Sequence, residues 1–217
     1  MKNTLSKKKI TIVLGLLEEL YPDAKAELNF SNSFELLIAT ILSAQCTDAR
    51  VNKVTQELFM ELKKPQDFIE LGENELINRI KTCGLGNSKG KNIIGTSKLL
   101  VERYKGKVPG SMEELLELPG VGRKTANVVL SNAFGVPAIA VDTHVFRVSN
   151  RIGLACSSTV EKTELDLMDN IPRKRWTKAH HLLIFHGRRI CKARNPQCEI
   201  CPINIYCRYY NTRGDKE

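Results

Sequence analysis

The sequence predicts an all-α protein, and three observations carry this prediction. Apolar residues recur at helical spacing along nearly all of the 217 residues. The alternation typical of strands is absent except for one short apolar run, 136–141, which can equally be a connector. Hydrophobic residues make up 42% of the chain, enough for a buried core and too many for a disordered tail or a collagen-like chain. No apolar run approaches the length of a membrane span.

Local signals place the individual helices. The apolar stretch 10–17 is followed at once by Glu18 and Glu19, so it is interpreted as one face of an amphipathic helix and not as a secretion signal. Side chains that can satisfy free backbone N–H groups mark later helix starts, and helix-breaking residues mark the ends between them. The predicted starts are Ser33, Thr47 or Asp48, Ser88, Ser111 and Ser158; the predicted breaks are Pro65, Gly84 and Pro109-Gly110.

The charge balance points to a polyanionic partner. Lys and Arg number 33 against 24 Asp and Glu, which gives a formal net charge of +9. Charge alone does not separate nucleic acid from anionic lipid or from mere solubility, so a motif has to decide.

One such motif is the segment 118–126, which lies between two predicted helices. Gly120 and Gly122 permit a tight turn whose N–H groups point one way, and a helix begins near Arg123. A turn of this kind next to a positive helix N-terminus is a ready anion site, and a DNA phosphate would be held there without reading of sequence. The alternative is an ordinary Gly-Pro connector between helices.

Two residues near this turn are candidates for chemistry. Lys124 is predicted in the first turn of the helix, where the helix dipole and any partial burial both favour a neutral, nucleophilic amine. A surface lysine that pairs with phosphate is the alternative. Asp142 opens a predicted helix after the apolar connector. It is either a plain N-cap or a carboxylate that stabilises a developing cationic sugar and moves protons.

The seven cysteines are an odd number, which argues against a secreted disulfide framework and for a reducing compartment, the cytoplasm. Three of them, Cys46, Cys83 and Cys156, are interpreted as small buried hydrophobes. The other four crowd the C-terminal end and can hold one metal centre: Cys191, Cys198, Cys201 and Cys207. A structural zinc site usually shows two close pairs and only one is present, yet four thiolates suit zinc as well as an iron-sulfur cluster.

Taken together, segment 118–126, residues 141–144 and the terminal cysteines resemble the endonuclease III family, bifunctional DNA glycosylases and abasic-site lyases of the helix-hairpin-helix superfamily. Shorter matching segments cover most of the chain: 42–45, 84–85, 87–89, 180–181 and 186–188. The resemblance implies a six-helix barrel domain with the helix-hairpin-helix, residues 27–136, and an iron-sulfur cluster domain made of residues 1–26 and 137–217. The active site would lie in the cleft between them.

The resemblance also implies a chemistry. Lys124 would attack C1′ of the damaged nucleotide, expel the base and form a Schiff base, and β-elimination would then cut the strand on the 3′ side. Asp142 would be the family's carboxylate. Related adenine and thymine-mismatch glycosylases lack a lysine nucleophile at this position and typically leave the strand uncut.

The same resemblance implies a cofactor and DNA contacts. The four terminal cysteines would bind a [4Fe-4S] cluster, and the loop between the first two would present Lys192 and Arg194 to phosphate. Gln45 and Leu85 would fill the gap left by a flipped-out nucleotide. The remaining predicted DNA contacts are Gly120, Val121, Gly122, Arg123, Thr125, His144 and Arg147. The chain departs from the family at Gly86, where an aromatic residue is frequent, and at Gly90, where alanine is usual.

The expected function is the excision of oxidised or ring-damaged pyrimidines from double-stranded DNA, with strand cleavage at abasic sites. The protein is expected to be a cytoplasmic, nucleoid-associated monomer with no membrane partner. A non-catalytic DNA-binding module with a structural or redox-active cluster is the alternative. His180 and His181 are expected at helix surface and core, and Trp176 is expected to pack in the protein and not against a base.

Overall fold

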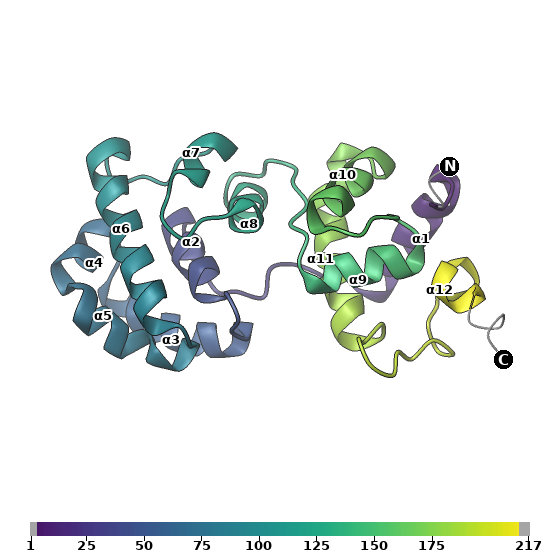
Figure 1. Cartoon of the computed structure of the whole chain (residues 1–217), viewed down its shortest axis with the longest axis horizontal. Helices are drawn as coiled ribbons and strands as arrows, with labels where there is room; N and C mark the ends of the chain where they lie inside the picture. Colours follow the sequence, from purple (N-terminus) through teal and green to yellow (C-terminus); the bar gives the residue numbers. More distant parts are fainter. Residues whose placement is uncertain (1–3, 213–217) are drawn as a thin grey trace. The chain divides into compact units, whose positions relative to one another are not determined.

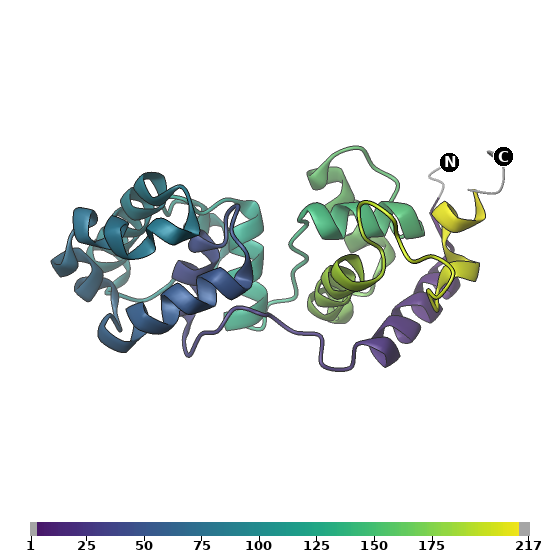
Figure 2. The same cartoon turned by 90° about the horizontal axis from the view of Figure 1, so that it is seen from below.

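The computed structural model describes residues 4–212 and divides the chain into two compact units (Figures 1 and 2). One unit is Ala26–Val136, and the other joins Met1–Lys25 to Pro137–Glu217. Within residues 4–212 all regular secondary structure is helical and no strand occurs, so the all-α prediction is confirmed. The apolar run 136–141 is a connector. No helix in the described part of the chain has both the length and the apolar character needed to cross a membrane.

The unit Ala26–Val136 contains six helices of seven residues or more and one short helix, α7. Its elements are α2 (Ser33–Leu42), α3 (Asp48–Glu61), α4 (Pro65–Leu71), α5 (Glu73–Ile80), the 3-10 turn η1 (Lys81–Cys83), α6 (Gly86–Tyr104), α7 (Met112–Leu116) and α8 (Arg123–Ala133). The helix α2 is buried along its whole length after Ser33 and contacts α3, α6 and α8. It therefore forms the centre of this unit, as its continuous apolar sequence predicts.

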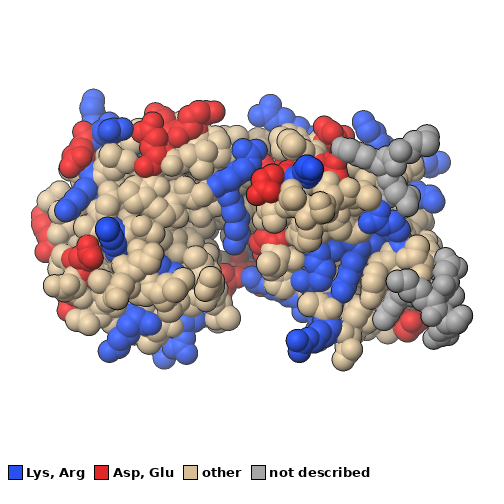
Figure 3. All heavy atoms as spheres, in the orientation of Figure 1, with Lys and Arg blue, Asp and Glu red and all other residues tan. Residues whose placement is uncertain are grey.

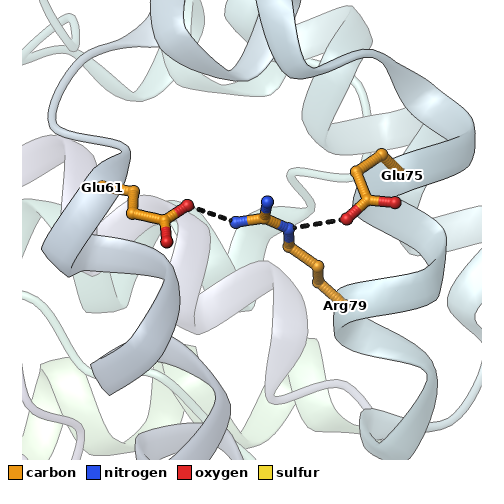
Figure 4. A network of polar contacts seen from close by, with 3 residues as sticks. All are labelled: Glu61, Glu75 and Arg79. Atoms are coloured by element: carbon orange, nitrogen blue, oxygen red, sulfur yellow. Dashed lines mark hydrogen bonds and ion pairs between the residues drawn. The ribbon is translucent and has the colours of Figure 1, made fainter.

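A polar bridge links two helices at the surface of the same unit (Figure 4). Arg79 on α5 donates to Glu61 on α3 at 2.6 Å and to Glu75, one turn earlier on α5, at 2.9 Å. Because these side chains are solvent-accessible, the pair interactions contribute little to the stability of the fold.

The other unit has its own core. Its elements are α1 (Lys7–Leu20), α9 (Thr143–Ile152), α10 (Val160–Asn170), the 3-10 turn η2 (Arg173–Arg175), α11 (Trp176–Arg189), the 3-10 turn η3 (Asn204–Tyr206) and α12 (Arg208–Asn211). The apolar face 10–17 of α1 packs in this core together with α9 and α11, so the amphipathic interpretation of that segment is confirmed.

Four of the predicted helix starts can be compared with the observed N-caps. Thr47 caps α3 and Ser111 caps α7, each accepting from the backbone N–H three residues later, as predicted. The prediction at Ser88 is wrong, because α6 begins two residues earlier at Gly86, after Leu85 in the left-handed conformation. The prediction at Ser158 is wrong by one residue, because Thr159 accepts the N–H of Lys162 and caps α10.

Three predictions about burial need correction. His180 and His181 are both buried, at 3% and 7% exposure, so neither is on the helix surface. Of the three cysteines interpreted as buried hydrophobes, Cys83 is buried, Cys46 is half-buried and Cys156 is exposed.

Gly86 and Gly90, the two departures from the pattern of the family that the sequence resembles, differ in their surroundings. A Cβ at Gly90 would lie 2.5 Å from Cγ1 of Ile77, so glycine allows α6 to approach α5 closely. A Cβ at Gly86 would meet its neighbours at 3.6 Å or more, an ordinary contact, so the backbone there leaves room for a side chain.

Candidate functional site

The turn between α7 and α8 is anchored to the core of its unit. The side chains of Leu118 and Val121 are buried, and the N–H of Val121 donates to the carbonyl of Leu118 at 3.0 Å. Thr96 on α6 donates its hydroxyl to the carbonyl of Pro119 at 2.8 Å. Gly120 has φ +77° and lies directly on α6, a combination that only glycine meets without strain.

The first turn of α8 follows immediately. Gly122 is its N-cap in extended conformation, and no side chain caps the helix. Arg123 and Lys124 are exposed, and Thr125 is half-buried. The helix N-terminus thus favours an external anion, and two cationic side chains stand beside it. Lys124 is exposed, so the partial burial considered from the sequence is not found.

Gln45 and Leu85 share an unusual backbone. Both have φ +53°, in the left-handed region, and both side chains are exposed, Leu85 by 54%. Gln45 lies in the turn after α2, and Leu85 is the N-cap of α6. Left-handed backbone at a non-glycine residue costs about 1–2 kcal/mol, and such strain gathers at functional positions.

Asp142 is the N-cap of α9, because its Oδ1 accepts the N–H of Val145 at 2.7 Å. Its side chain is half-buried. The N-cap interpretation is therefore correct as a description of the local structure, and it fixes the carboxyl group at the start of the helix that also carries His144 and Arg147.

Arg147 directs its guanidinium at protein atoms. It donates to the carbonyls of Cys191, at 3.1 and 3.2 Å, and of Gly187, at 2.9 Å, and lies 3.2 Å from Nδ1 of His144. Burial lowers the pKa of Arg147, which stays a cation. This residue, predicted as a DNA contact, thus holds the segment that contains the first terminal cysteine.

The four terminal cysteines line one pocket of about 320 Å³, a volume that includes part of its mouth. The other lining residues include apolar side chains such as Ile152, Ile190 and Ile203. Burial raises the pKa of Cys201 to about 11 and also raises that of Cys207. Metal binding requires thiolates, so a cluster bound here displaces protons. Four thiols around one apolar-walled pocket are the donor set that an iron-sulfur cluster takes.

The loop after Cys191 is held by α9. Arg151 donates to the carbonyls of Lys192, at 2.7 Å, and Ala193, at 3.0 Å, and stacks on the ring of Tyr209 at 4.7 Å. The side chains of Lys192 and Arg194 are exposed on this pinned loop. Blue side chains gather over α9 and α11 in Figure 3, and part of that charge thus belongs to cations that bind the backbone.

A buried chain of polar side chains, Tyr21 and His186, leads to Cys201 in the pocket. The hydroxyl of Tyr21 lies 3.2 Å from Nδ1 of His186, and Nε2 of the same ring lies 3.6 Å from Sγ of Cys201. Burial lowers the pKa of His186 to about 4, so the ring is neutral and can donate to the sulfur while it accepts from the tyrosine.

The sequence missed the residues that support these sites. No role was predicted for Arg151, His186 or Lys89, because their partners are distant in the chain, although Lys89 and His186 fall in the segments 87–89 and 186–188 that resemble the family. Only an unexpectedly apolar neighbourhood for a charged residue could have indicated Lys89.

Comparisons with known proteins show the family to which the chain belongs. Residues 38–173 match the model of the HhH-GPD superfamily base excision DNA repair protein, and residues 191–207 match the iron-sulfur binding domain of endonuclease III, which begins and ends here at a terminal cysteine. Endonuclease III of Rickettsia conorii is 56% identical over 189 residues, 87% of this chain and 90% of that protein. The structure of a non-covalent endonuclease III–DNA complex superimposes with a TM-score of 0.92 at 49% identity, covering 98% of this chain and 100% of that one. A trapped endonuclease III–DNA covalent intermediate also matches with a TM-score of 0.92 at 49% identity, over 97% and 99% of the two chains.

Proposed function

The chain belongs to the endonuclease III family of base excision DNA repair enzymes, and from this premise we propose which of its residues perform the reaction. It is a DNA glycosylase and abasic-site lyase that acts on double-stranded DNA, with a [4Fe-4S] cluster as cofactor. We propose that its substrates are oxidised or ring-damaged pyrimidines and the abasic sites that their removal leaves.

Lys124 is the proposed nucleophile. Its amine forms a bond to C1′ as the bond from C1′ to the base breaks, and the base leaves with that electron pair. Loss of the amine proton and opening of the sugar ring give the imine, after which removal of a C2′ proton expels the 3′ phosphate. The observation that carries the assignment is its position: Lys124 is exposed in the first turn of α8, directly after a turn shaped to hold the backbone phosphate. The phosphate contact and the nucleophile thus lie on adjacent residues.

Asp142 is the proposed acid–base and electrostatic group. Its Oδ1 already accepts from Val145, which fixes the direction of the carboxylate and leaves Oδ2 as the atom for proton transfer. A negative charge fixed in this way stabilises the positive charge that develops on the sugar as the base leaves.

Two groups of residues hold the DNA at the reaction site. We propose that the N–H groups of the turn around Gly120, Val121 and Gly122 bind one backbone phosphate, supported by Arg123 and Thr125. Gln45 and Leu85 enter the gap left by the flipped-out nucleotide, because exposed side chains on strained backbone are already held in the required conformation.

The cysteine pocket supplies the second DNA contact. Cys191, Cys198, Cys201 and Cys207 are the proposed ligands, and the bound cluster ties both ends of the intervening loop. Arg147 and Arg151 fix the carbonyls of that loop, so Lys192 and Arg194 face phosphate on a rigid support. Arg147 serves the loop by this proposal, and His144, which lies against it, is the DNA contact of α9.

We place the protein in the cytoplasm, associated with the nucleoid as a monomer. The proposal rests on its DNA substrate and on the seven cysteines, which need a reducing compartment to stay available as ligands.

Borohydride trapping tests the nucleophile. The wild-type protein should form a covalent complex with a duplex that carries one abasic site, and Lys124→Gln should form none while it still binds the duplex. Lys98→Gln, which changes another exposed helical lysine of the same unit, should trap like the wild type. Trapping by Lys124→Gln would move the nucleophile to another residue. Failure of the wild type to trap, with DNA binding retained, would favour the DNA-binding module.

A further inference from the structure

Lys89 is a buried cation that joins two segments of the chain. It lies in α6 with 3% of its surface exposed. Its Nζ donates to the carbonyl oxygens of Leu42 and of Cys83, each at 2.8 Å. These two acceptors are 47 and 6 residues away in the sequence, so one ammonium group connects three elements, α6, α2 and η1.

Both acceptors lie just before an exposed residue on strained backbone. Leu42 is the last residue of α2, and Gln45 follows three residues later. Cys83 is the last residue of η1, and Leu85 follows two residues later. Lys89 therefore binds the stems of the two turns whose tips are Gln45 and Leu85.

Burial of the Lys89 ammonium group costs free energy, which indicates that its two hydrogen bonds have a structural role. An ammonium group taken out of water loses several kcal/mol of hydration. Burial accordingly lowers the pKa of Lys89, and the neighbouring thiols of Cys46 and Cys83 oppose that shift only in part. A methionine would fill the same space without this cost, so packing alone does not explain a lysine here.

We infer that Lys89 is a positioning residue that holds Gln45 and Leu85 at the separation needed to enter a DNA gap together. The inference rests on the gap-filling role proposed for those two residues. The left-handed backbone at each tip is strained, so a turn released from its stem relaxes toward an unstrained conformation. Because both stems are hydrogen-bonded to one ammonium group, the two tips are fixed relative to each other before DNA arrives. Binding then does not lose free energy to the ordering of these turns.

The test compares two DNA affinities of Lys89→Met, which replaces the ammonium by an apolar side chain of similar length. One duplex is intact, and the other carries a tetrahydrofuran abasic analogue. Fluorescence anisotropy should show that the preference for the analogue falls about ten-fold, since small misplacements of contact groups have effects of this size or larger. Affinity for the intact duplex, which rests on the α7–α8 turn and the loop after Cys191, should change less than two-fold.

Controls separate positioning from damage to the fold. Lys98→Met, an exposed lysine on the same helix, should keep both affinities. Should Lys89→Met not fold, Lys89→Gln, which retains a donor for one carbonyl, takes its place with the same expected pattern. An equal loss of both affinities, or a preserved preference in a folded variant, would overturn the inference.

A double-variant comparison distinguishes this inference from the proposed function. Gln45→Ala with Leu85→Ala should itself remove the preference, and adding Lys89→Met should then cost less than two-fold more. A full further loss would show that Lys89 acts elsewhere. If the double variant keeps the preference, gap filling by Gln45 and Leu85 is wrong and the inference falls with it, while the trapping result for Lys124 is unaffected.

Discussion

Replacement of Gly120 by alanine should damage the turn between α7 and α8, whereas the same change at Gly122 should not. At Gly120 the new Cβ would sit on backbone with φ +77° and lie 2.7 Å from Nδ2 and 2.9 Å from Cβ of Asn92. The backbone strain costs about 1–2 kcal/mol. The overpacking adds about 1–3 kcal/mol, since Cβ of Asn92 is attached to α6 and cannot rotate away.

An effect of the substitution on the unfolded state offsets part of this destabilisation. Alanine has fewer unfolded conformations than glycine, a gain of about 0.4–1 kcal/mol. The expected net destabilisation by Gly120→Ala is therefore about 1–4.5 kcal/mol. At Gly122 the Cβ would meet nothing within 4 Å on backbone with φ −96°. There the same gain roughly balances the loss of a favourable N-cap residue, and stability should change by less than about 0.5 kcal/mol.

Urea unfolding followed by circular dichroism measures the difference, and hydrogen exchange of residues 112–133 locates it. Gly120→Ala should lower the urea midpoint, speed exchange in this segment and weaken binding to intact duplex. Equal stability of the two alanine variants would refute the reasoning, because it would mean that neither the positive φ nor the approach to Asn92 constrains the turn.

Three further predictions concern the other unit. Cys198→Ser should lose the visible absorbance of the iron-sulfur cluster, while Cys156→Ser, at an exposed cysteine outside the pocket, should keep it. Burial, with a smaller contribution from His180, lowers the pKa of His181 to about 3, below its ordinary 6.5. The unfolded state then binds a proton that the folded state does not, so stability should fall by about 1.5 kcal/mol from pH 6.5 to pH 5, and His181→Gln should show a flatter dependence of its urea midpoint on pH. Lys192→Ala should lower the slope of log affinity against log salt by about one, and a slope equal to that of the wild type would remove the phosphate contact.

The features predicted correctly from the sequence are those that depend on hydrogen bonds between residues close together in the chain. Thr47 and Ser111 cap their helices through a backbone N–H three residues away, so the signal and its partner lie in one short window. The turn at 118–126 and the cysteine spacing are local in the same sense. Contacts from other elements then fix their conformations: Thr96 on α6 binds the carbonyl of Pro119, and Arg151 on α9 binds the loop after Cys191.

The predictions that failed depended on distant contacts. The helix α6 begins at Gly86 and not at Ser88, because the left-handed Leu85 redirects the chain and the stem before it is tied to α2 through Lys89. His180 was expected at the helix surface but is only 3% exposed, because other elements of its unit cover it, which a residue count along one helix does not reveal. The hold of Arg147 on the segment around Cys191 could not be predicted either, because its acceptors are 40 and 44 residues away.

The buried and half-buried cations change what the net charge means for DNA binding. Lys89, Arg147 and Arg151 all contribute to the formal charge of +9, yet their donors are directed at main-chain carbonyls. A cation whose hydrogen bonds are already made inside the protein releases few counterions from a phosphate, because it cannot approach one. The salt dependence of DNA binding should therefore follow the exposed cations, such as Lys192 and Arg194, and fall short of the slope that the net charge suggests. The internal cations fix backbone segments through their hydrogen bonds, and by our proposal the exposed residues on those segments meet DNA already in place.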